Sequence, residues 1–294
     1  MSTRRDFLKG VSLATAGMAL NPGNVFANSM TSKETAQAKS EKVKIAYIGI
    51  GNRGEQNITE FAKTNMVDVV ALCDVDLDGK QCQKVLNMYP NAKRFRDFRK
   101  LFEEYADHFD AVAASVPDHI HFFVAMTAMK YGKHVYCEKP LGNSIEECNI
   151  MVRAAKKYDR VIQVGQWQRS DPHWQDAVDF VRSGKLGKIR TVRVFSYQGW
   201  CPSIPVKPDG PVPDGVDYDM WLGPAPARPF NPNRFHFTFR WFWDYAGGLM
   251  TDWGVHLLDY ALYGMDVTAP KSVMASGGKN GYPDDACETP DPLQ

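Results

Sequence analysis

A glycine-rich turn that follows directly on a short apolar segment is the feature that most constrains how this chain folds. The apolar segment covers 43–50, and its end overlaps a Gly-x-Gly-x-x-Gly pattern over 49–54, after which 55–63 suits a helix. The next apolar segment ends at Asp74, 20 residues after the last glycine of that pattern. In strand–turn–helix units that bind dinucleotides, an acidic residue at about this distance binds the ribose. The spacing therefore predicts a nucleotide-binding turn.

The residue types within the turn fit this chemistry. Gly49 and Gly51 would let the backbone turn tightly and approach a pyrophosphate, and Gly54 would let the helix pack closely on the strand. The helix that begins near Asn52 and Arg53 would present backbone N–H groups to the phosphate charge. A tight turn that binds no ligand is the alternative interpretation.

The acidic residue also indicates which dinucleotide the turn would bind. Asp74 would accept hydrogen bonds from the ribose hydroxyls and would repel a 2′-phosphate, so NAD is favoured over NADP. Arg53 beside the turn leaves NADP as an alternative, because an arginine can accommodate that phosphate.

Strand and helix patterns alternate as far as residue 164, which predicts an α/β fold with a doubly wound parallel sheet. After the first unit, the predicted strands are 68–73, 92–95, 111–116, 134–137 and 161–164, and the predicted helices are 78–89, 98–105, 119–131 and 145–158. Ser115, Pro117 and Asp118 lie at the carboxyl end of one strand, where open α/β sheets bind their ligands. We therefore expect all three to border the cofactor.

Several motifs carry a family resemblance. They are the glycine turn over 49–54, Pro117-Asp118-His119-Ile120-His121, Gly132-Lys133-His134-Val135-Tyr136-Cys137-Glu138-Lys139-Pro140, and the segment from Asp252 to His256. With these, the chain after residue 42 resembles the Gfo/Idh/MocA family, which includes glucose–fructose oxidoreductase and inositol dehydrogenase. The resemblance implies an N-terminal Rossmann domain, a C-terminal α+β domain with an open antiparallel sheet, and hydride transfer between a nicotinamide cofactor and a sugar or polyol hydroxyl.

Lys139 is the first candidate catalytic residue. It follows strand 134–137 at the edge of the sheet, where an ammonium can stabilise the negative charge that grows on a substrate oxygen. Position alone favours the alternative interpretation, an exposed loop lysine paired with Glu138. The resemblance implies that Lys139 is catalytic, and we place Glu138, His121 and Gln166 beside the cofactor.

Asp252 and His256 are the other candidates, four residues apart and so on one face of a helix. A histidine is a natural proton acceptor near neutral pH, and a carboxylate would orient it or bind a second hydroxyl. The pair could instead be structural or bind a metal, but no third ligand has a suitable spacing, so we predict no metal site. The resemblance implies that both residues act with Lys139 on the substrate.

The second half of the chain has a different pattern. All seven tryptophans follow residue 160, an alternating segment over 189–197 predicts a strand, and 200–235 is rich in proline. Aromatic rings suit both a sugar cleft and an ordinary core. Trp167 and Arg169 are candidate substrate residues, although packing between domains explains them equally well. The chain ends soon after a strand-like segment over 272–276, so we expect the domain to be incomplete, either as a fragment or as a short family member.

The N-terminus predicts export. Arg4-Arg5 precedes a ten-residue apolar stretch over 11–20, with small residues at Val25 and Ala27, which is typical of a twin-arginine signal. A basic amphipathic start or a membrane anchor is the alternative, but ten residues cannot cross roughly 30 Å of hydrocarbon. Proteins exported this way fold in a reducing compartment, so we expect buried thiols rather than disulfides.

The predicted organisation is therefore a signal over 1–27, a polar tether over 28–42, a nucleotide-binding domain over 43–164 and a substrate domain over 165–294. We expect a periplasmic NAD(P)-dependent oxidoreductase that retains and recycles its cofactor. It would use the twin-arginine machinery, lack a stable membrane span and, if full length, form a homo-oligomer. The net charge of +1 does not suggest nucleic-acid binding. An NAD-dependent glycoside hydrolase or lyase that works through a transient keto-sugar is the main alternative, followed by a non-catalytic sugar sensor.

Overall fold

A computed structural model of the protein describes residues 42–196 and 203–291. The predicted signal over 1–27, nearly all of the predicted tether over 28–42, and Cys201 lie outside these ranges.

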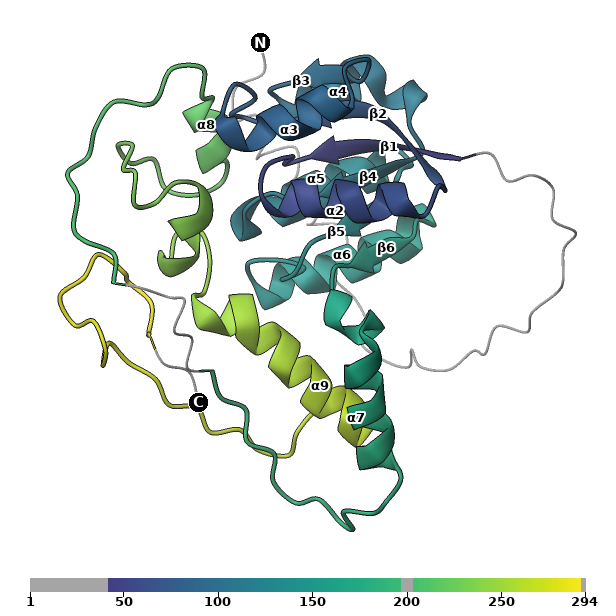
Figure 1. Ribbon diagram of the computed structural model, residues 1–294, viewed down its shortest axis with the longest axis vertical. Coiled ribbons are helices and arrows are strands. Elements are labelled where there is room, and N and C mark those ends of the chain that lie inside the picture. The colour runs from purple at the N-terminus through teal and green to yellow at the C-terminus, as the bar shows by residue number, and fades with distance from the viewer. Residues whose placement is uncertain (1–41, 197–202, 292–294) are drawn as a thin grey trace, which may run out of the picture.

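The N-terminal half is built on one six-stranded parallel sheet (Figure 1). Its strands are β1 (Val43–Ile48), β2 (Val67–Cys73), β3 (Lys93–Phe95), β4 (Ala111–Ala114), β5 (His134–Cys137) and β6 (Ile162–Val164). They are ordered β3-β2-β1-β4-β5-β6, which is the doubly wound order of dinucleotide-binding sheets. The chain adds β2 and β3 on one side of β1, and then returns to add β4 on its other side. The loops after β1 and β4 therefore diverge and leave room for a ligand.

Helices cover both faces of this sheet, as the alternating pattern predicts. They are α2 (Arg53–Lys63), α3 (Lys80–Met88), α4 (Phe98–Tyr105), with its one-turn extension η1 (Ala106–His108), α5 (Asp118–Lys130) and α6 (Ile145–Tyr158). Successive side chains of β1 point to opposite faces: Ala46 and Ile48 pack with α4, α5 and α6, whereas Ile45 and Tyr47 pack with α2 and α3. Apolar side chains on both faces of each strand account for the continuous apolar segments in the sequence.

The second half contains helices and long irregular segments. Its helices are η2 (Trp167–Ser170), α7 (Pro172–Arg182), α8 (Tyr218–Leu222), η3 (His236–Trp241), the π-helical turn η4 (Met250–Gly254) and α9 (Val255–Met265). An aromatic core holds this half together, in which Trp221, Phe230 and Trp241 are buried. Burial of these rings anchors the described part of the proline-rich stretch, and it accounts for Trp221 and Trp241 by packing rather than by substrate binding.

The strands predicted in this half do not form. Residues 189–195 have no strand conformation, Ser196 makes a single bridge, and Tyr197 lies outside the described ranges. The segment 272–276 is likewise irregular. The open antiparallel sheet is thus not present in the described residues, because alternation produces a strand only where neighbouring strands supply hydrogen-bond partners. The coarser expectation is confirmed, since a distinct second unit follows the parallel sheet.

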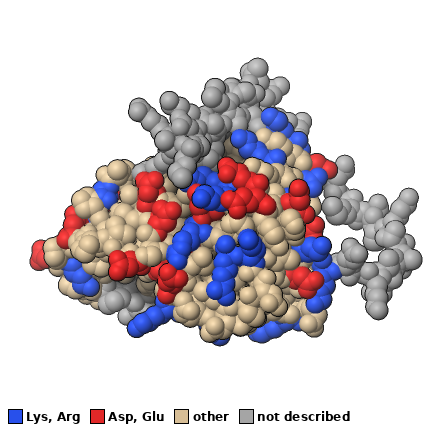
Figure 2. Space-filling model, turned by 90° about the horizontal axis from the view of Figure 1, so that it is seen from above, with Lys and Arg blue, Asp and Glu red and all other residues tan. Residues whose placement is uncertain are grey.

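Other expectations concern thiols, membrane spans and charge. Cys73, Cys82 and Cys137 are buried free thiols, in agreement with the predicted reduced state. Within the described ranges, no helix is both long and apolar enough to cross a membrane. On the face shown in Figure 2, acidic and basic side chains are interspersed.

Candidate active site

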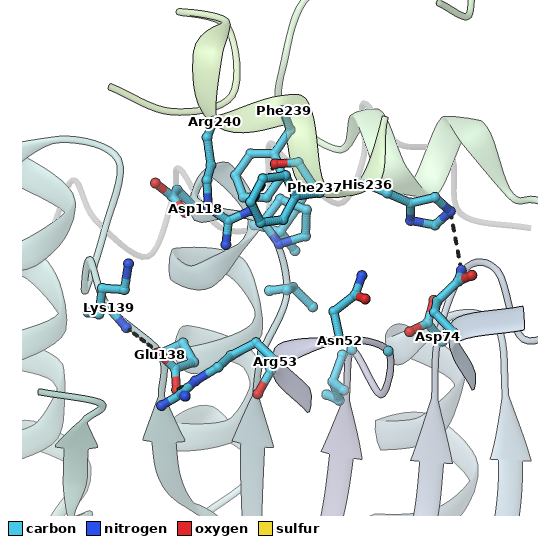
Figure 3. Close-up of a pocket in the computed structure, with 18 of the residues that line it drawn as sticks. Asn52, Arg53, Asp74, Asp118, Glu138, Lys139, His236, Phe237, Phe239 and Arg240 are labelled. Carbon is cyan, nitrogen blue, oxygen red and sulfur yellow. Dashed lines mark hydrogen bonds and ion pairs between the residues drawn. The ribbon is translucent and has the colours of Figure 1, made fainter. Parts of the chain in front are cut away.

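A cavity of about 490 Å³ lies at the carboxyl edge of the sheet. Its floor comes from the ends of β1, β2, β4 and β5, and η3 and η4 from the second half supply the opposite wall (Figure 3). The cavity therefore lies where an open α/β sheet binds its ligand, and both halves of the chain contribute to it.

The glycine turn leaves no room for side chains. Gly49 has a φ of 79°, and a Cβ there would lie 2.5 Å from the carbonyl oxygen of Ser115. A Cβ on Gly54 would lie 2.0 Å from the carbonyl oxygen of Gly49. Helix α2 begins directly after the turn, and Asn52 at its N-cap makes no capping hydrogen bond with its side chain. The cavity thus opens on a bare backbone and an uncapped helix N-terminus, which fit a pyrophosphate.

Asp74 is fixed at the end of β2. Its two carboxylate oxygens accept hydrogen bonds from the backbone N–H groups of Ile50 (2.9 Å) and Asp76 (3.0 Å). A carboxylate has about four acceptor positions, so these two bonds leave capacity to accept from a ribose hydroxyl. Arg53 points away from Asp74 and towards Glu138 (Figure 3), and it is not placed to bind a 2′-phosphate beside Asp74. These residues fit NAD better than NADP.

Glu138 belongs to a buried hydrogen-bond network under the cavity. It accepts hydrogen bonds from Arg53 Nε at 2.8 Å and from Asn57 Nδ2 at 2.9 Å. Burial acts to raise the pKa of Glu138, but Arg53 and Asn57 outweigh it and hold that pKa below its usual value. Glu138 meets Lys139 only through the backbone N–H at 3.2 Å. The alternative interpretation of Lys139 as a loop lysine paired with Glu138 is therefore wrong.

The Lys139 ammonium instead contacts the second half of the chain. Its Nζ donates to the Asp252 carboxylate at 2.7 Å and to the Asp252 carbonyl oxygen at 2.8 Å. Since an ammonium has three hydrogens, one remains for a substrate oxygen. Arg240 Nε donates to the same carboxylate oxygen at 3.1 Å. Burial acts to raise the pKa of Asp252, yet Lys139 and Arg240 hold it below the ordinary value, so this carboxylate stays ionised.

Asp252 and His256 do not lie on one continuous α-helix. Asp252 belongs to the π-helical turn η4, and His256 belongs to the first turn of α9. The Asp252 carboxylate bonds to Lys139 and Arg240, and it thereby positions Lys139, whereas the sequence suggested that it would orient the histidine. Wider π-helical turns often occur at functional sites, because they redirect side chains that an α-helix would align.

His256 lies between two tryptophans. It is 4% exposed, and its ring centroid lies 6.0 Å from that of Trp167 and 6.4 Å from that of Trp253. Burial, and then the nearby Lys139 ammonium, lower the pKa of His256 to about 4. Its Nδ1 is buried and has no hydrogen-bond partner among the described residues. His256 is therefore a neutral imidazole at neutral pH and can accept a proton.

The depressed pKa makes a prediction about stability. Between pH 6.5 and 4 the unfolded chain binds a proton at this histidine and the folded protein does not, so the free energy of unfolding falls as the pH falls through this range. The loss attributable to His256 should reach about 3 kcal/mol. Urea denaturation of the wild type and of His256→Gln at several pH values should show a shallower acid loss in the variant. Parallel curves would contradict the assignment.

Asp118 adds a second buried carboxyl to the cavity wall. It is the first residue of α5 and is 7% exposed. Burial raises the pKa of Asp118 to about 7, although Arg240 and Lys139 act in the opposite direction. Asp118 is thus partly protonated near neutral pH.

The structure brings most of the predicted site residues together. Those that line the cavity are Gly49, Gly51, Asn52, Arg53, Asp74, Ser115, Pro117, Asp118, Glu138, Lys139, Trp167, Asp252 and His256. Four others lie behind it or beside it. Gly54 packs against the turn, His121 contacts the Pro140 carbonyl oxygen at 2.6 Å, Gln166 lies 3.5 Å from the Val255 carbonyl oxygen, and Arg169 pairs with Asp259. In the described residues, no group of three or more His, Cys, Asp or Glu is placed to hold a metal ion.

Sequence reasoning missed the wall formed by η3. His236, Phe237, Phe239 and Arg240 all line the cavity (Figure 3). The density of aromatic residues in this segment was a signal of burial, but nothing local indicated which cavity they would reach. His236, for which the sequence offers no partner, contacts Asp76, 160 positions earlier in the chain.

Two family models match the chain. Residues 43–166 match "Oxidoreductase family, NAD-binding Rossmann fold", and residues 181–289 match "Oxidoreductase family, C-terminal alpha/beta domain". Together they cover the sheet that forms the cavity floor and the elements η3 and η4 that form the opposite wall.

Individual relatives share part of the chain. An inositol 2-dehydrogenase/D-chiro-inositol 3-dehydrogenase of Lactiplantibacillus plantarum is 29% identical over 51% of this chain and 43% of its own length. A glycosyl hydrolase family 109 protein of Shewanella baltica is 28% identical over 63% of this chain and 44% of its own length. The chain spans about half the length of the curated relatives it matches.

One solved structure shows the same fold over most of the chain. It is the WlbA dehydrogenase from Bordetella pertussis in complex with NADH and UDP-GlcNAcA, and it matches with a TM-score of 0.62 and 20% identity. The match covers 85% of this chain and 65% of that one.

Proposed function

Because this chain belongs to the Gfo/Idh/MocA oxidoreductase family, we propose that it transfers a hydride between NAD and a hydroxyl group of a sugar, glycoside or polyol. The observation that carries the proposal is that the Lys139 ammonium, bonded to Asp252, and the neutral His256 line the same cavity as the glycine turn. An alcohol oxidation needs these two groups, one for the oxygen and one for the proton.

The residues divide the work as follows. Gly49, Gly51 and Asp74 bind the cofactor through its pyrophosphate and ribose. Bound nicotinamide supplies the acceptor for the two electrons and the hydrogen that leave the substrate carbon. His256 takes the hydroxyl proton, and the third hydrogen of the Lys139 ammonium bonds to the oxygen as its negative charge grows.

The remaining wall would orient the substrate. Trp167 and Trp253 flank His256, and their apolar faces suit the C–H side of a sugar ring. Phe237 and Phe239 form a second apolar wall beside Arg240, with both ring centroids 4.8 Å from its guanidinium carbon. A polar ligand with apolar faces, such as an inositol or a pyranoside, matches this mixture of rings and charges.

Turnover with a panel of inositols, hexoses and glycosides tests the proposal. We expect nicotinamide reduction with at least one member of the panel. We also expect this activity to disappear in a Lys139→Ala, His256→Ala double variant. Full activity in that double variant would contradict the catalytic roles assigned to Lys139 and His256.

A second candidate is glycoside cleavage through transient oxidation. It is favoured by the similarity to the glycosyl hydrolase family 109 protein. In that reaction the sugar is oxidised, the aglycone is eliminated, and the reducing equivalents return to the product. Aglycone release from a chromogenic glycoside without net NADH formation would select this chemistry over plain dehydrogenation.

The predicted export signal leads to a proposal about the cofactor. An exported enzyme meets no pool of free nicotinamide dinucleotide, so we propose that this protein folds with NAD and carries it through the twin-arginine machinery to the periplasm. It would then recycle the cofactor with a second substrate and, if full length, act as a homo-oligomer. Release of NAD only on denaturation of the mature protein supports this proposal. A purified protein that is empty and binds NAD weakly contradicts it.

A further inference from the structure

At the Asp74 end of the cavity, the second half of the chain is attached to the first through a histidine. His236 Nε2 lies 2.8 Å from the Asp76 carboxylate, which is buried at 7% exposure and also accepts a hydrogen bond from Gln81 at 2.6 Å. A carboxylate oxygen accepts, so this contact is a hydrogen bond in the tautomer whose Nε2 carries the hydrogen. Gln81 Nε2 lies 3.2 Å from the same His236 nitrogen. The bond joins η3 to the loop that follows β2.

The same loop carries the residue that would bind the ribose. The backbone N–H of Asp76 donates to the Asp74 carboxylate at 3.0 Å, so His236, Asp76 and Asp74 form one chain of hydrogen bonds. His236 also lines the cavity itself, together with Gln81 and Phe237. The histidine thus bounds the part of the cavity where Asp74 lies.

A second contact fastens this loop close by. The backbone N–H of Asp217 donates to the Val75 carbonyl oxygen at 2.9 Å, and Arg96 bridges the Gly215 carbonyl oxygen and Asp78. These bonds hold the irregular segment before α8 against the loop. His236 ties η3, which is part of the opposite wall, to the same loop by a side-chain hydrogen bond.

His236 is held in place from its own side as well. Its ring lies 3.9 Å from that of Phe235, which is buried in the aromatic core. Its backbone has a φ of 54°, a left-handed conformation that is unfavourable for a non-glycine residue. Such a conformation persists where the surroundings fix it. The side chain is therefore presented to Asp76 by a rigid support.

We propose that His236 is a cofactor-retention residue, whose bond to Asp76 fastens η3 across the ribose end of the cavity and slows the release of NAD. This inference rests on the proposed function, since it takes NAD to be the ligand of the cavity. An NAD molecule that leaves past Asp74 must first break this bond, whereas a substrate that binds beside Lys139 at the other end need not. The residue acts on cofactor exchange and leaves the chemical groups at the catalytic end in place.

Cofactor release can be measured without turnover. NADH is bound to the protein, a large excess of NAD is added, and the decay of NADH fluorescence gives the dissociation rate. We expect His236→Leu to release NADH about tenfold faster than the wild type, the effect of losing one charge-assisted hydrogen bond. His236→Gln, whose amide can still donate to Asp76, should lie between the two.

A matched control comes from another histidine–aspartate contact. His173 Nδ1 lies 3.0 Å from the Asp171 carboxylate, on the surface and outside the cavity. His173→Leu removes a similar contact and should release NADH at the wild-type rate. Asp76→Asn weakens the His236 bond from the other side and should also accelerate release, which serves if His236→Leu does not fold.

The outcomes separate this inference from the proposed function. NADH binding by the wild type together with an unchanged rate in His236→Leu and Asp76→Asn overturns the retention role and leaves the cofactor assignment intact. Failure of the wild type to bind NADH overturns both. Equal acceleration in His173→Leu would show a general loosening and would also overturn the specific role of His236.

Discussion

Replacement of Lys139 by methionine should lower kcat/KM by about 10²–10³-fold, the size of effect that follows the loss of one preorganised donor to a developing oxyanion. The Lys139 side chain is 14% exposed and its ammonium already pairs with Asp252, so its orientation is fixed before a substrate binds. Methionine keeps the length of the side chain and loses the charge. The measurement is steady-state turnover on whichever substrate the panel identifies.

The fold should survive this substitution. Removal of one partner of a buried ion pair normally leaves the other charge uncompensated. Here Arg240 still pairs with Asp252 at 3.1 Å, so the carboxylate keeps a counter-ion. NADH binding should therefore remain close to wild type. The exposed Lys156, in the last turn of α6, offers a control: Lys156→Met should leave turnover unchanged. Near wild-type turnover in Lys139→Met would remove Lys139 from the reaction.

Replacement of Gly54 by alanine should cost about 3 kcal/mol of unfolding free energy, at the upper end of typical overpacking effects. The new Cβ would lie 2.0 Å from the Gly49 carbonyl oxygen. Neither atom can rotate away, because the oxygen belongs to the backbone and the backbone fixes the position of the Cβ. Alanine is otherwise a better helix former than glycine, so propensity alone would favour the variant. The clash forces α2 away from the turn, and NADH binding should weaken at the same time.

Chemical denaturation and NADH titration measure both effects. Gly210 is a suitable control, because a Cβ there meets no atom within 4 Å. Gly210→Ala should change neither stability nor NADH binding measurably. If Gly54→Ala proves as stable as Gly210→Ala, a glycine at position 54 is not needed for α2 to pack on the turn.

The first half of the fold was predictable because its signals are local. Helices 98–105 and 145–158 and the strand 134–137 have the predicted bounds, since apolar periodicity changes where each element ends. The strand predicted over 189–197 failed for a non-local reason. Alternation describes the two sides that a strand would have, but the strand forms only if a neighbour lies beside it.

The candidate site was predictable to a similar extent. Lys139, Asp252 and His256 came from the family resemblance, and the structure places all three in one cavity. Arg240 and His236 were missed because their partners are defined only by the tertiary fold. The π-helical turn at Asp252 was also invisible, since a four-residue spacing is compatible with either kind of helix.

The bond between Lys139 and Asp252 joins residues 113 positions apart, one from each half of the chain. It therefore limits how such a protein can be recombined with its relatives. A chimera that takes its C-terminal half from another protein must bring an acidic residue to meet Lys139, or it leaves a buried ammonium unpaired at a cost of about 3–5 kcal/mol. Exchange of the second half can therefore change the substrate only when the protein that supplies the new half also supplies this carboxylate. The ion pair thus determines which C-terminal halves can be combined with this N-terminal half.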